Sequence, residues 1–353
     1  MPESISVPST SPIPSATFLG DINTLLRDLS DSDRSVWQSA ENRLVALGVQ
    51  AVDSLLPYVG DGGSSRLKWS AESVLKRLGD EALPRLREIR RQGPGRLRSK
   101  ALKVLVDLGG TECLDEVDRR AVERLVRIKL MDELPVKVPS EAGRWLAFPA
   151  DRLDDAVSAL GLQDLRPVTT VMGVAATTRS TDYVEFQDSQ GETQTAYRVF
   201  ITPEFESWRS NLEFKNWRLL WGNSFLDELD SFALADKLSE RCGEAHFYII
   251  DPYNAAENWY VARDGHRVRS FGSYDSPQFQ GEPLPFEVEY REDAEDEDEA
   301  EEYAEGVPSA LTAADNLSVE PGPMLADDTH DHGWLATTRP DVPNSRFKGA
   351  LPI

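Results

Sequence analysis

The chain has 353 residues, 40% of them hydrophobic, and a formal net charge of −23. This length allows two or three domains, each with its own core. No apolar run approaches the ~20 residues of a membrane span, and the Ser/Pro-rich residues 1–17 lack the basic and apolar stretches of a secretory signal. We therefore expect a cytoplasmic protein without membrane contacts. Cys113 and Cys242 lie far apart with no CxxC spacing, which excludes a disulfide framework and a cysteine-based metal site, and both are predicted to be small core residues.

Charge is distributed unevenly along the chain. Residues 66–129 hold 17 Lys/Arg against 10 Asp/Glu, and residues 85–103 alone hold eight basic residues. Residues 291–305, in contrast, contain ten acidic residues and one arginine. A basic helical region is therefore followed by an acidic run. Residues 1–17 and 291–308 have too few apolar side chains to offset the entropy of ordering, so both are predicted to be disordered.

Three similar segments follow one another in the N-terminal third: SAENRLVALG (residues 39–48), SAESVLKRLG (70–79) and SKALKVLVDLG (99–109). Apolar residues recur through each at helical spacing. Each segment holds one alanine at an equivalent position, where a close helix crossing would exclude a larger side chain: Ala40, Ala71 and Ala101. The glycine that ends each segment suits the left-handed position that closes a helix. A second helix is expected after each, over residues 51–59, 82–90 and from 113 to near 130.

These helix pairs resemble HEAT-like repeats, and their period of about 30 residues is similar to that of the short variety named after phycocyanobilin lyases. The resemblance covers residues 25–117. It implies an α-solenoid, a fold that mostly presents a surface to protein partners and by itself specifies no chemistry.

After residue 134 the pattern changes from helical to β-rich. The predicted strands are 144–148, 168–173, 183–186, 197–202, 217–222, 245–250, 258–263 and 267–271, and the predicted helices are 150–160 and 231–242. Asp264 and Gly265 between two alternating runs are a strong hairpin signal. The order favours an antiparallel sheet with helices on one face, an α+β domain. This block resembles a C-terminal domain of uncharacterised actinobacterial proteins, a resemblance that implies fold and lineage but no activity.

The fold class predicted is therefore multidomain, an α-solenoid of HEAT-like repeats followed by an antiparallel α+β domain. The expected parts are 1–17, a disordered N-terminus; 18–134, the helical repeats; 140–290, the α+β domain; 291–308, an acidic linker; and 309–353, a segment partly packed on the α+β domain.

Two sets of residues have the side chains that chemistry would need. His330, Asp331 and His332, near Asp327 and Asp328, are ligand types for Zn²⁺ or Mn²⁺, but a polar loop is the expected reading because a third protein ligand would have to come from elsewhere.

The second set pairs histidines with aspartates that suit acid–base work: His246 and His266 with Asp251 and Asp264. No nucleophile motif, P-loop or dinucleotide fingerprint accompanies them. No catalytic residue, metal site or cofactor is therefore predicted, and the chain is more an interaction protein than an enzyme.

The basic run 85–103 and the aromatic residues of the second domain are candidates for partner binding. The run could match a phosphate backbone, but no aromatic residue interleaves its arginines for base stacking and the net charge repels polyanions. Most of the aromatic residues are expected in the sheet core, with two at strand ends left for contact. The residues predicted to bind a partner are Arg85, Arg87, Arg90, Arg91, Arg96, Arg98, Lys100, Tyr253 and Trp259.

The favoured function is a protein–protein interaction module of a bacterial cytoplasmic protein with an unidentified protein partner. By analogy with small α+β immunity proteins, a toxin-immunity or other conflict setting is the expected context. Nucleic-acid binding through residues 85–103 and an enzyme of unknown class are the alternatives.

Overall fold

The computed structural model describes residues 16–60, 65–131, 133, 143–177, 182–207, 213–214, 216–228, 230–274, 278–287, 308–321 and 329–349. Two compact units make up the chain, Met1–Leu108 and Gly109–Ile353. The segments expected to be disordered, 1–17 and 291–308, lie outside the described residues except at their inner ends. There, Ala16 and Thr17 belong to the first helix, and the carbonyl oxygen of Pro308 accepts a hydrogen bond from Trp259.

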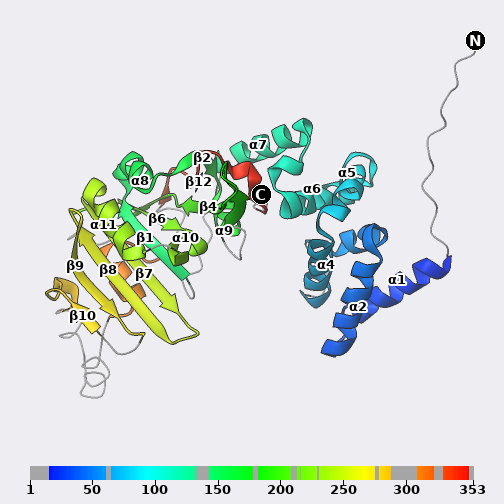
Figure 1. Cartoon of the computed structure of the whole chain (residues 1–353), viewed down its shortest axis with the longest axis horizontal. Coiled ribbons are helices and arrows are strands. Elements are labelled where there is room, and N and C mark those ends of the chain that lie inside the picture. Colours follow the sequence, from blue (N-terminus) through cyan, green and yellow to red (C-terminus); the bar gives the residue numbers. More distant parts are fainter. Residues whose placement is uncertain are drawn as a thin grey trace, which may run out of the picture. The chain divides into compact units, whose positions relative to one another are not determined.

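The N-terminal unit is an α-solenoid, drawn from blue to cyan in Figure 1. Its helices are α1 (Ala16–Asp28), α2 (Arg34–Ala46), α3 (Val52–Leu55), α4 (Ser65–Leu78), α5 (Leu83–Gln92) and α6 (Gly95–Gly109). Short 3₁₀ turns join them: η1 (Gly48–Ala51), η2 (Leu56–Tyr58) and η3 (Gly79–Ala82). The three repeated segments form α2, α4 and α6, as predicted, and a shorter helix follows each of the first two.

The equivalent alanines lie at the centre of the solenoid. Ala40, Ala71 and Ala101 are 2%, 0% and 0% exposed, which confirms the register of the repeat. The first two repeats also end as predicted, since Gly48 and Gly79 have φ of +61° and +54°. In the third repeat the left-handed residue is Gly110, with φ of +65°, one residue later than expected.

We expect Ala71→Leu to lower the free energy of unfolding by about 1–3 kcal/mol, the usual cost of forcing extra methyl groups into a filled crossing. Ala71 has no exposed surface. Ala46, near the end of α2, is exposed, so Ala46→Leu is the matched control and should leave the melting temperature almost unchanged. Equal melting curves for the two variants would contradict the repeat register.

Among the described residues, the C-terminal unit is built on a twelve-stranded sheet with the order β10-β9-β8-β7-β1-β6-β4-β12-β2. Every recorded pairing is antiparallel; β3 pairs with β4, and β5 joins β6 to β11. The strands are β1 (Gly143–Pro149), β2 (Gln163–Val168), β3 (Tyr183–Gln187), β4 (Thr193–Ile201), β5 (Glu204–Glu206), β6 (Asn216–Trp221), β7 (Glu244–Asp251), β8 (Ala256–Arg263), β9 (His266–Gly272), β10 (Gln278–Gln280), β11 (Thr329–His330) and β12 (Gly333–Thr337). The helices and turns are α7 (Glu116–Met131), α8 (Leu153–Leu160), α9 (Thr170–Ala176), α10 (Asn223–Glu228), α11 (Ser231–Cys242), α14 (Ala310–Leu317), η4 (Thr111–Cys113), η5 (Ala150–Arg152) and η7 (Asn344–Arg346).

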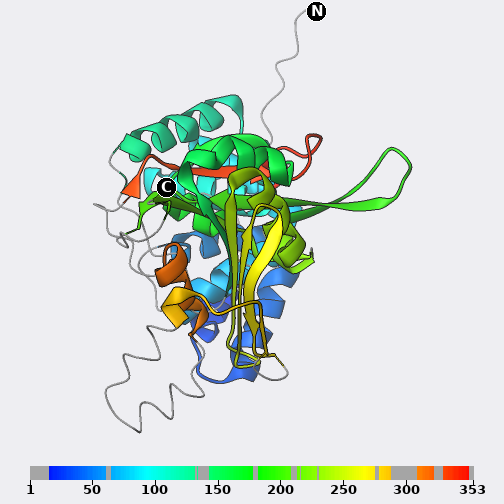
Figure 2. The ribbon, with the colours of Figure 1, turned by 90° about the vertical axis from the view of Figure 1, so that its left-hand side faces the viewer.

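Helices cover both faces of this sheet, not one face as the sequence suggested. Along β7 the side chains alternate: Phe247 packs in the core that α8 and α11 close, whereas the Tyr248 hydroxyl reaches the Ser318 hydroxyl at the end of α14, 3.1 Å away. Figure 2 shows α14 (orange) and α11 (yellow-green) on opposite sides of the strands. The sheet is therefore a buried middle layer.

The predicted strand 168–173 is wrong. β2 ends at Val168, and Thr169 caps α9 by accepting a hydrogen bond from the Met172 amide (3.2 Å). Threonine is a favoured N-cap, so the apolar run after it is helical. Gly173 lets this helix lie against β4, because a Cβ there would collide with the ring of Phe200.

Other parts of the second domain follow the sequence closely. α11 has the predicted bounds, and the hairpin between β8 and β9 turns on Asp264 and Gly265, both with positive φ (49° and 81°). The C-terminal segment was expected only to pack partly on the α+β domain. It is instead part of the sheet, since β12 pairs with both β4 and β2. None of the described helices is long and apolar enough to cross a membrane.

The helix α7 belongs to the C-terminal unit, whereas the sequence placed the boundary at residue 134. Turn η4, just before α7, packs against turn η7 near the C-terminus, and Gly110 permits this approach because a Cβ there would collide with the Phe347 carbonyl oxygen. The Ser345 hydroxyl also donates to the Glu112 carboxylate (3.4 Å). The turn that precedes α7 is therefore anchored to the turn near the C-terminus.

Candidate functional site

Several side chains of the basic run 85–103 hold the solenoid repeats together. Arg85 on α5 donates two hydrogen bonds to Asp53 on α3 (2.7 and 2.5 Å) and one to Glu88 (2.6 Å), and these carboxylates raise its pKa. Lys100 on α6 donates to the Pro57 carbonyl oxygen (2.6 Å). Both contacts join one helix pair to another. The Arg85 and Lys100 side chains therefore stabilise the stacking of the repeats and are not free to bind a ligand.

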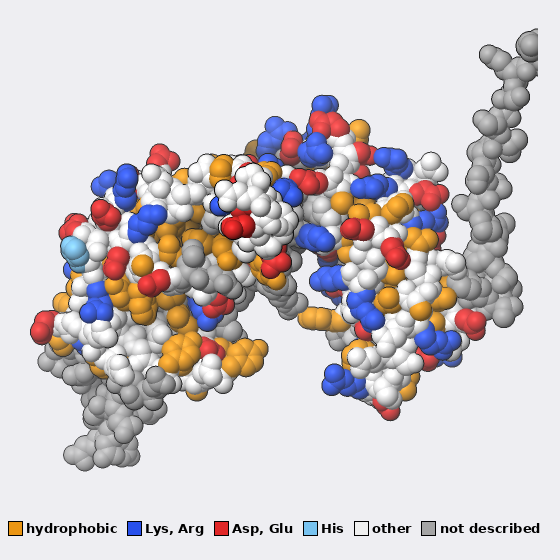
Figure 3. All heavy atoms as spheres, in the orientation of Figure 1, with side chains coloured by type: hydrophobic (Ala, Val, Ile, Leu, Met, Phe, Trp, Pro, Cys, Tyr) orange, Lys and Arg blue, Asp and Glu red, His pale blue; other side chains and the backbone are white. Residues whose placement is uncertain are grey.

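The remaining arginines of the run do not converge either. Arg98 donates to the Gly93 carbonyl oxygen (2.7 Å) and Arg90 to that of Arg98 (3.3 Å), while Arg87 and Arg91 have interactions of their own. Arg96 is exposed. On the face in Figure 3 basic and acidic side chains are interspersed. The expected basic stripe is thus largely a set of contacts within the fold.

The two aromatic candidates have opposite environments. Tyr253, in the turn between β7 and β8, is 94% exposed, as expected for a contact residue. Trp259, on β8, is 0% exposed and packs against Phe271 and Phe286, so its prediction as a contact residue is wrong. It lies in the middle of β8, where the second face of the sheet is covered.

The His330–Asp331–His332 segment holds no metal cluster within the described residues, and Asp327 and Asp328 lie outside them. His330 approaches Glu206 (3.8 Å), whereas His332 bonds to Asp331 (2.7 Å). Asp331 also accepts from the buried Arg218 (2.8 Å). The Arg218 guanidinium therefore already pairs with the Asp331 carboxylate, which a metal ion would need as a ligand.

The second histidine set forms no exposed acid–base pair. His246 is fully buried and bonds to Glu244 (3.0 Å) and Tyr248 (3.1 Å), not to Asp251 or Asp264. The histidine and the nearby Arg263 lower the pKa of Glu244, although burial alone would raise it. This network lies inside the sheet, where it links β7 to α14 through Ser318. The other histidine of the set, His266, is exposed on β9.

A pocket of about 780 Å³ lies between α7 and the end of the sheet, entirely within the C-terminal unit. One wall comes from η4 and α7, and the opposite wall from β2, β4, α9, β12 and η7. Its floor is apolar, with side chains no more than 9% exposed from Val122, Val126, Val168, Met172, Leu335 and Phe347. Such a concave, mostly apolar site with a few polar groups is typical of ligand binding.

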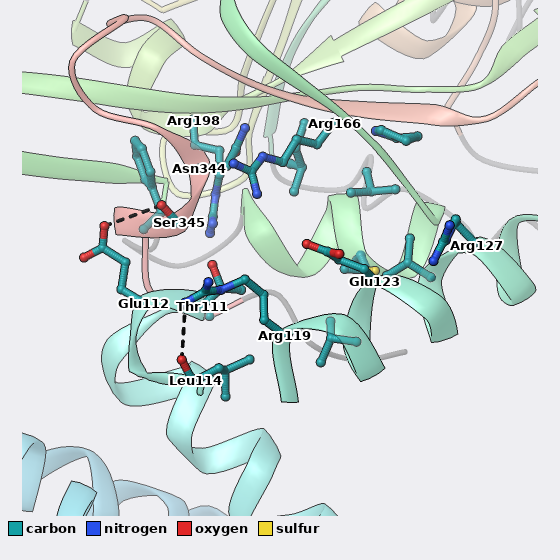
Figure 4. Close-up of a pocket in the computed structure, with 18 residues that line it drawn as sticks. Thr111, Glu112, Leu114, Arg119, Glu123, Arg127, Arg166, Arg198, Asn344 and Ser345 are labelled. Carbon is teal, nitrogen blue, oxygen red and sulfur yellow. Dashed lines mark hydrogen bonds between the residues drawn. The ribbon is translucent and has the colours of Figure 1, made fainter. Parts of the chain in front are cut away.

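Four arginines line this pocket, against two glutamates. Figure 4 shows Arg119, Glu123 and Arg127 rising from α7, and Arg166 and Arg198 coming from the strands. Arg119 pairs with Glu116 (2.9 Å) and Arg166 with Asp164 (3.1 Å), but Arg127 is exposed and makes no ion pair or hydrogen bond with any described residue. Arginines therefore outnumber acidic residues in the pocket lining, and Arg127 is an unused donor group.

Arg198 on β4 is the deepest of the four, 2% exposed. Its guanidinium donates to the carbonyl oxygens of Ala176 (2.9 Å) and Lys348 (3.0 Å) and lies over the Phe347 ring. Burial lowers its pKa to about 9, only partly offset by Asp182. It stays charged at neutral pH, and a nearby anion would stabilise that charge.

One buried acceptor accompanies these donors. Asn344, 7% exposed, donates from its side chain to the Asp164 carbonyl oxygen (2.6 Å), which fixes the orientation of the amide. Its Oδ1 has no hydrogen-bond partner. A buried polar atom without a partner costs free energy, so it is a marker for a missing ligand or water.

Iodoacetamide at pH 8 should alkylate Cys113 and leave Cys242 unmodified in the native protein. Burial, with Asp155 nearby, raises the pKa of Cys242 to about 12, and the residue is 2% exposed. Cys113 is half-buried, so it is not the core residue predicted, and its neighbours Glu112 and Leu114 line the pocket. Peptide mapping by mass spectrometry measures both, and urea-unfolded protein should be labelled at both. Equal labelling in the native state would contradict the burial of Cys242.

The pocket residues were not among those predicted from the sequence. Arg119, Glu123 and Arg127 recur at i, i+4 and i+8, so their common helix face was a usable signal. Arg166, Arg198 and Asn344 come from three separate elements, and only the pairing of β12 with β2 and β4 brings these elements together.

No protein-family model matches the chain, and no curated protein is similar to it. Among solved structures, the complex of CpcE and CpcF of phycocyanin lyase from Nostoc sp. PCC7120 is similar, at 24% identity and a TM-score of 0.20, over 31% of this chain and 68% of that one. A TM-score of 0.20 carries no argument about this chain, so the likeness to phycocyanobilin-lyase-type repeats rests on the sequence period and on the helices α2, α4 and α6. The actinobacterial resemblance has no counterpart here.

Proposed function

We propose that the chain is a protein-binding module whose C-terminal unit takes up a carboxylate-rich segment of a partner protein in the arginine-lined pocket. The observation that carries this is the placement of four arginines around one pocket with an apolar floor. Arginine forms bidentate, charge-assisted hydrogen bonds with carboxylates, which are stronger than those between neutral groups.

The lining of the pocket also favours a peptide over an inorganic anion as its ligand. A peptide has carboxylates for Arg127 and Arg166, backbone N–H groups for an acceptor such as Asn344 Oδ1, and aliphatic carbons for the floor. An inorganic anion has no donor for that acceptor and nothing to bury against Val122 and Val126. Glu112 and Glu123, on the α7 side, would repel an anion placed close to them, so one carboxylate is expected at the strand residue Arg166 and the other at the unpaired Arg127.

The test is isothermal titration of an N-acetylated tetraglutamate peptide into the full chain at 50 mM salt. The double variant Arg127→Gln/Arg166→Gln should weaken binding at least tenfold, since each lost charged hydrogen bond is worth about 1.5–3 kcal/mol. The matched control is Arg241→Gln/Arg267→Gln, which removes two exposed arginines elsewhere in the same unit. Its affinity should stay within twofold of the parent.

Three results would overturn the proposal: no binding of the peptide, an equal loss in the control variant, or tighter binding of inorganic phosphate in a parallel titration. The last result would identify a small-anion site. Higher salt should weaken the peptide contact in every active variant.

Nucleic-acid binding through residues 85–103 stays the alternative proposal, and the contacts of Arg85, Arg98 and Lys100 within the solenoid weigh against it. A role in toxin immunity or another conflict setting is a finer proposal. Support for that role would require a toxin whose acidic segment competes with the tetraglutamate peptide for the pocket.

A further inference from the structure

Helix α7 has a second apolar face, opposite the one it buries. Val117, Leu125, Ile128 and Met131 are 77%, 42%, 44% and 75% exposed. At about 100° per residue these four positions lie within an arc of about 120°, and their mean direction is about 145° from that of the buried Val122 and Val126. A helix that is apolar on two sides ordinarily has a neighbour on each.

This face, which we call the outer stripe (Val117, Leu125, Ile128 and Met131), concentrates the exposed apolar surface of the protein. Of the ten large hydrophobic side chains that are exposed among the described residues, four belong to it. Apolar residues scattered singly over a surface are ordinary, whereas a contiguous set marks an interaction site.

The charges around the outer stripe indicate what covers it. By helical geometry Arg124 lies within the stripe, Arg120 on one edge and Lys129 on the other. Arg120 pairs with Glu116 (2.7 Å), but Arg124 is exposed and makes no ion pair or hydrogen bond with any described residue. The covering surface must therefore be apolar and carry carboxylates where it meets Arg124 and Lys129.

We propose that the outer stripe docks an amphipathic, acidic helix of a partner protein, in the helix-on-helix mode in which apolar anchors recur at i, i+3, i+4 and i+7. The inference does not depend on the pocket, because none of the four residues of the outer stripe lines it. The chain's own acidic run, residues 291–305, offers only three alanines and one tyrosine as apolar residues and cannot cover the stripe.

A second copy of this chain fits less well. A two-fold symmetric contact would pair α7 with itself in antiparallel register, and the middle of the stripe would bring Arg124 against Arg124 of the second copy. Like charges at the centre of an interface destabilise it. An acidic helix instead gives Arg124 a carboxylate partner.

The probe is a fluorescein-labelled 18-residue helical peptide with leucines along one face and glutamates flanking them, followed by fluorescence anisotropy with the full chain. Leu125→Ser/Ile128→Ser should weaken binding at least tenfold. Arg124→Glu should weaken it as well, and a peptide with lysines in place of glutamates should restore binding to that variant alone. Val49→Ser/Tyr253→Ser, which removes two exposed apolar side chains elsewhere, is the control and should bind like the parent.

The two proposals fail separately. Leu125→Ser/Ile128→Ser should leave tetraglutamate binding unchanged, and Arg127→Gln/Arg166→Gln should leave the helical peptide within twofold. Absence of peptide binding, an equal loss in the control, or no rescue of Arg124→Glu would overturn this inference. So would sedimentation of the free chain as a dimer that Leu125→Ser/Ile128→Ser dissociates, since the second copy would then be the occupant.

Discussion

Trp259→Ala should lower the free energy of unfolding of the C-terminal unit by about 3–5 kcal/mol, the range found when a buried aromatic side chain is removed and leaves a cavity. Trp259 has no exposed surface, and its ring lies 6.1, 6.4 and 6.0 Å from those of Phe271, Phe279 and Phe286. Its indole N–H donates to the Pro308 carbonyl oxygen (3.1 Å). The variant therefore loses packing and leaves one buried acceptor without its donor.

Tyr253→Ala is the matched aromatic control. Tyr253 is 94% exposed, so its removal should change the free energy of unfolding by no more than about 0.5 kcal/mol. Urea denaturation followed by circular dichroism measures both variants. A cost below about 1 kcal/mol for Trp259→Ala would show that the second face of the sheet is open and that Trp259 is available to a partner after all.

The contrast between these two residues shows what sequence alone could not supply. Both lie near the ends of predicted strands, and both were expected to be exposed. Exposure of an aromatic residue on a strand depends on whether anything covers that face of the sheet. Here α14 covers that face, and it follows the long acidic run, which carries no pattern that indicates pairing with the sheet.

The solenoid was predictable because its signals are local. The alanines and glycines of the repeat satisfy requirements set within one helix pair, a close crossing and a left-handed turn, and they recur at a fixed period. The hairpin at Asp264 and Gly265 was predictable for the same reason. Its two residues adopt positive φ, which few other sequences tolerate.

The pocket depends instead on contacts between residues far apart in the chain. Arg166 and Arg198 line the same pocket because β12 joins β2 to β4 in one sheet, and η4, which precedes α7, contacts η7 because Gly110 permits the approach. Sequence patterns of period 2 or 3.6 describe which residues share a face of one element. These patterns do not show which elements become neighbours in space, so a site built from five or more elements cannot be predicted from them.

Arg269→Met should cost about 3–5 kcal/mol, because it leaves the carboxylate of Glu287 buried without its counter-charge. The two side chains are 5% and 2% exposed, and they share two hydrogen bonds of 3.0 and 2.6 Å. Glu287 also accepts from the Leu284 amide (2.8 Å), and the Arg269 guanidinium lies over the Phe279 ring. The pair therefore fixes residues 284–287 against β9 and β10.

The double variant Arg269→Met/Glu287→Leu separates the energy of the pair from the cost of breaking it. Replacing both charges with apolar side chains of similar volume removes the unpaired charge, so the double variant should recover most of the stability that Arg269→Met loses. A double-mutant cycle by urea denaturation measures this coupling. If the two single variants and the double variant have additive effects, the pair is open to water and its charges act independently. If instead the double variant exceeds the parent in stability, the ion pair opposes folding on balance, and its role is to select this packing of residues 284–287 over other apolar arrangements on the same face.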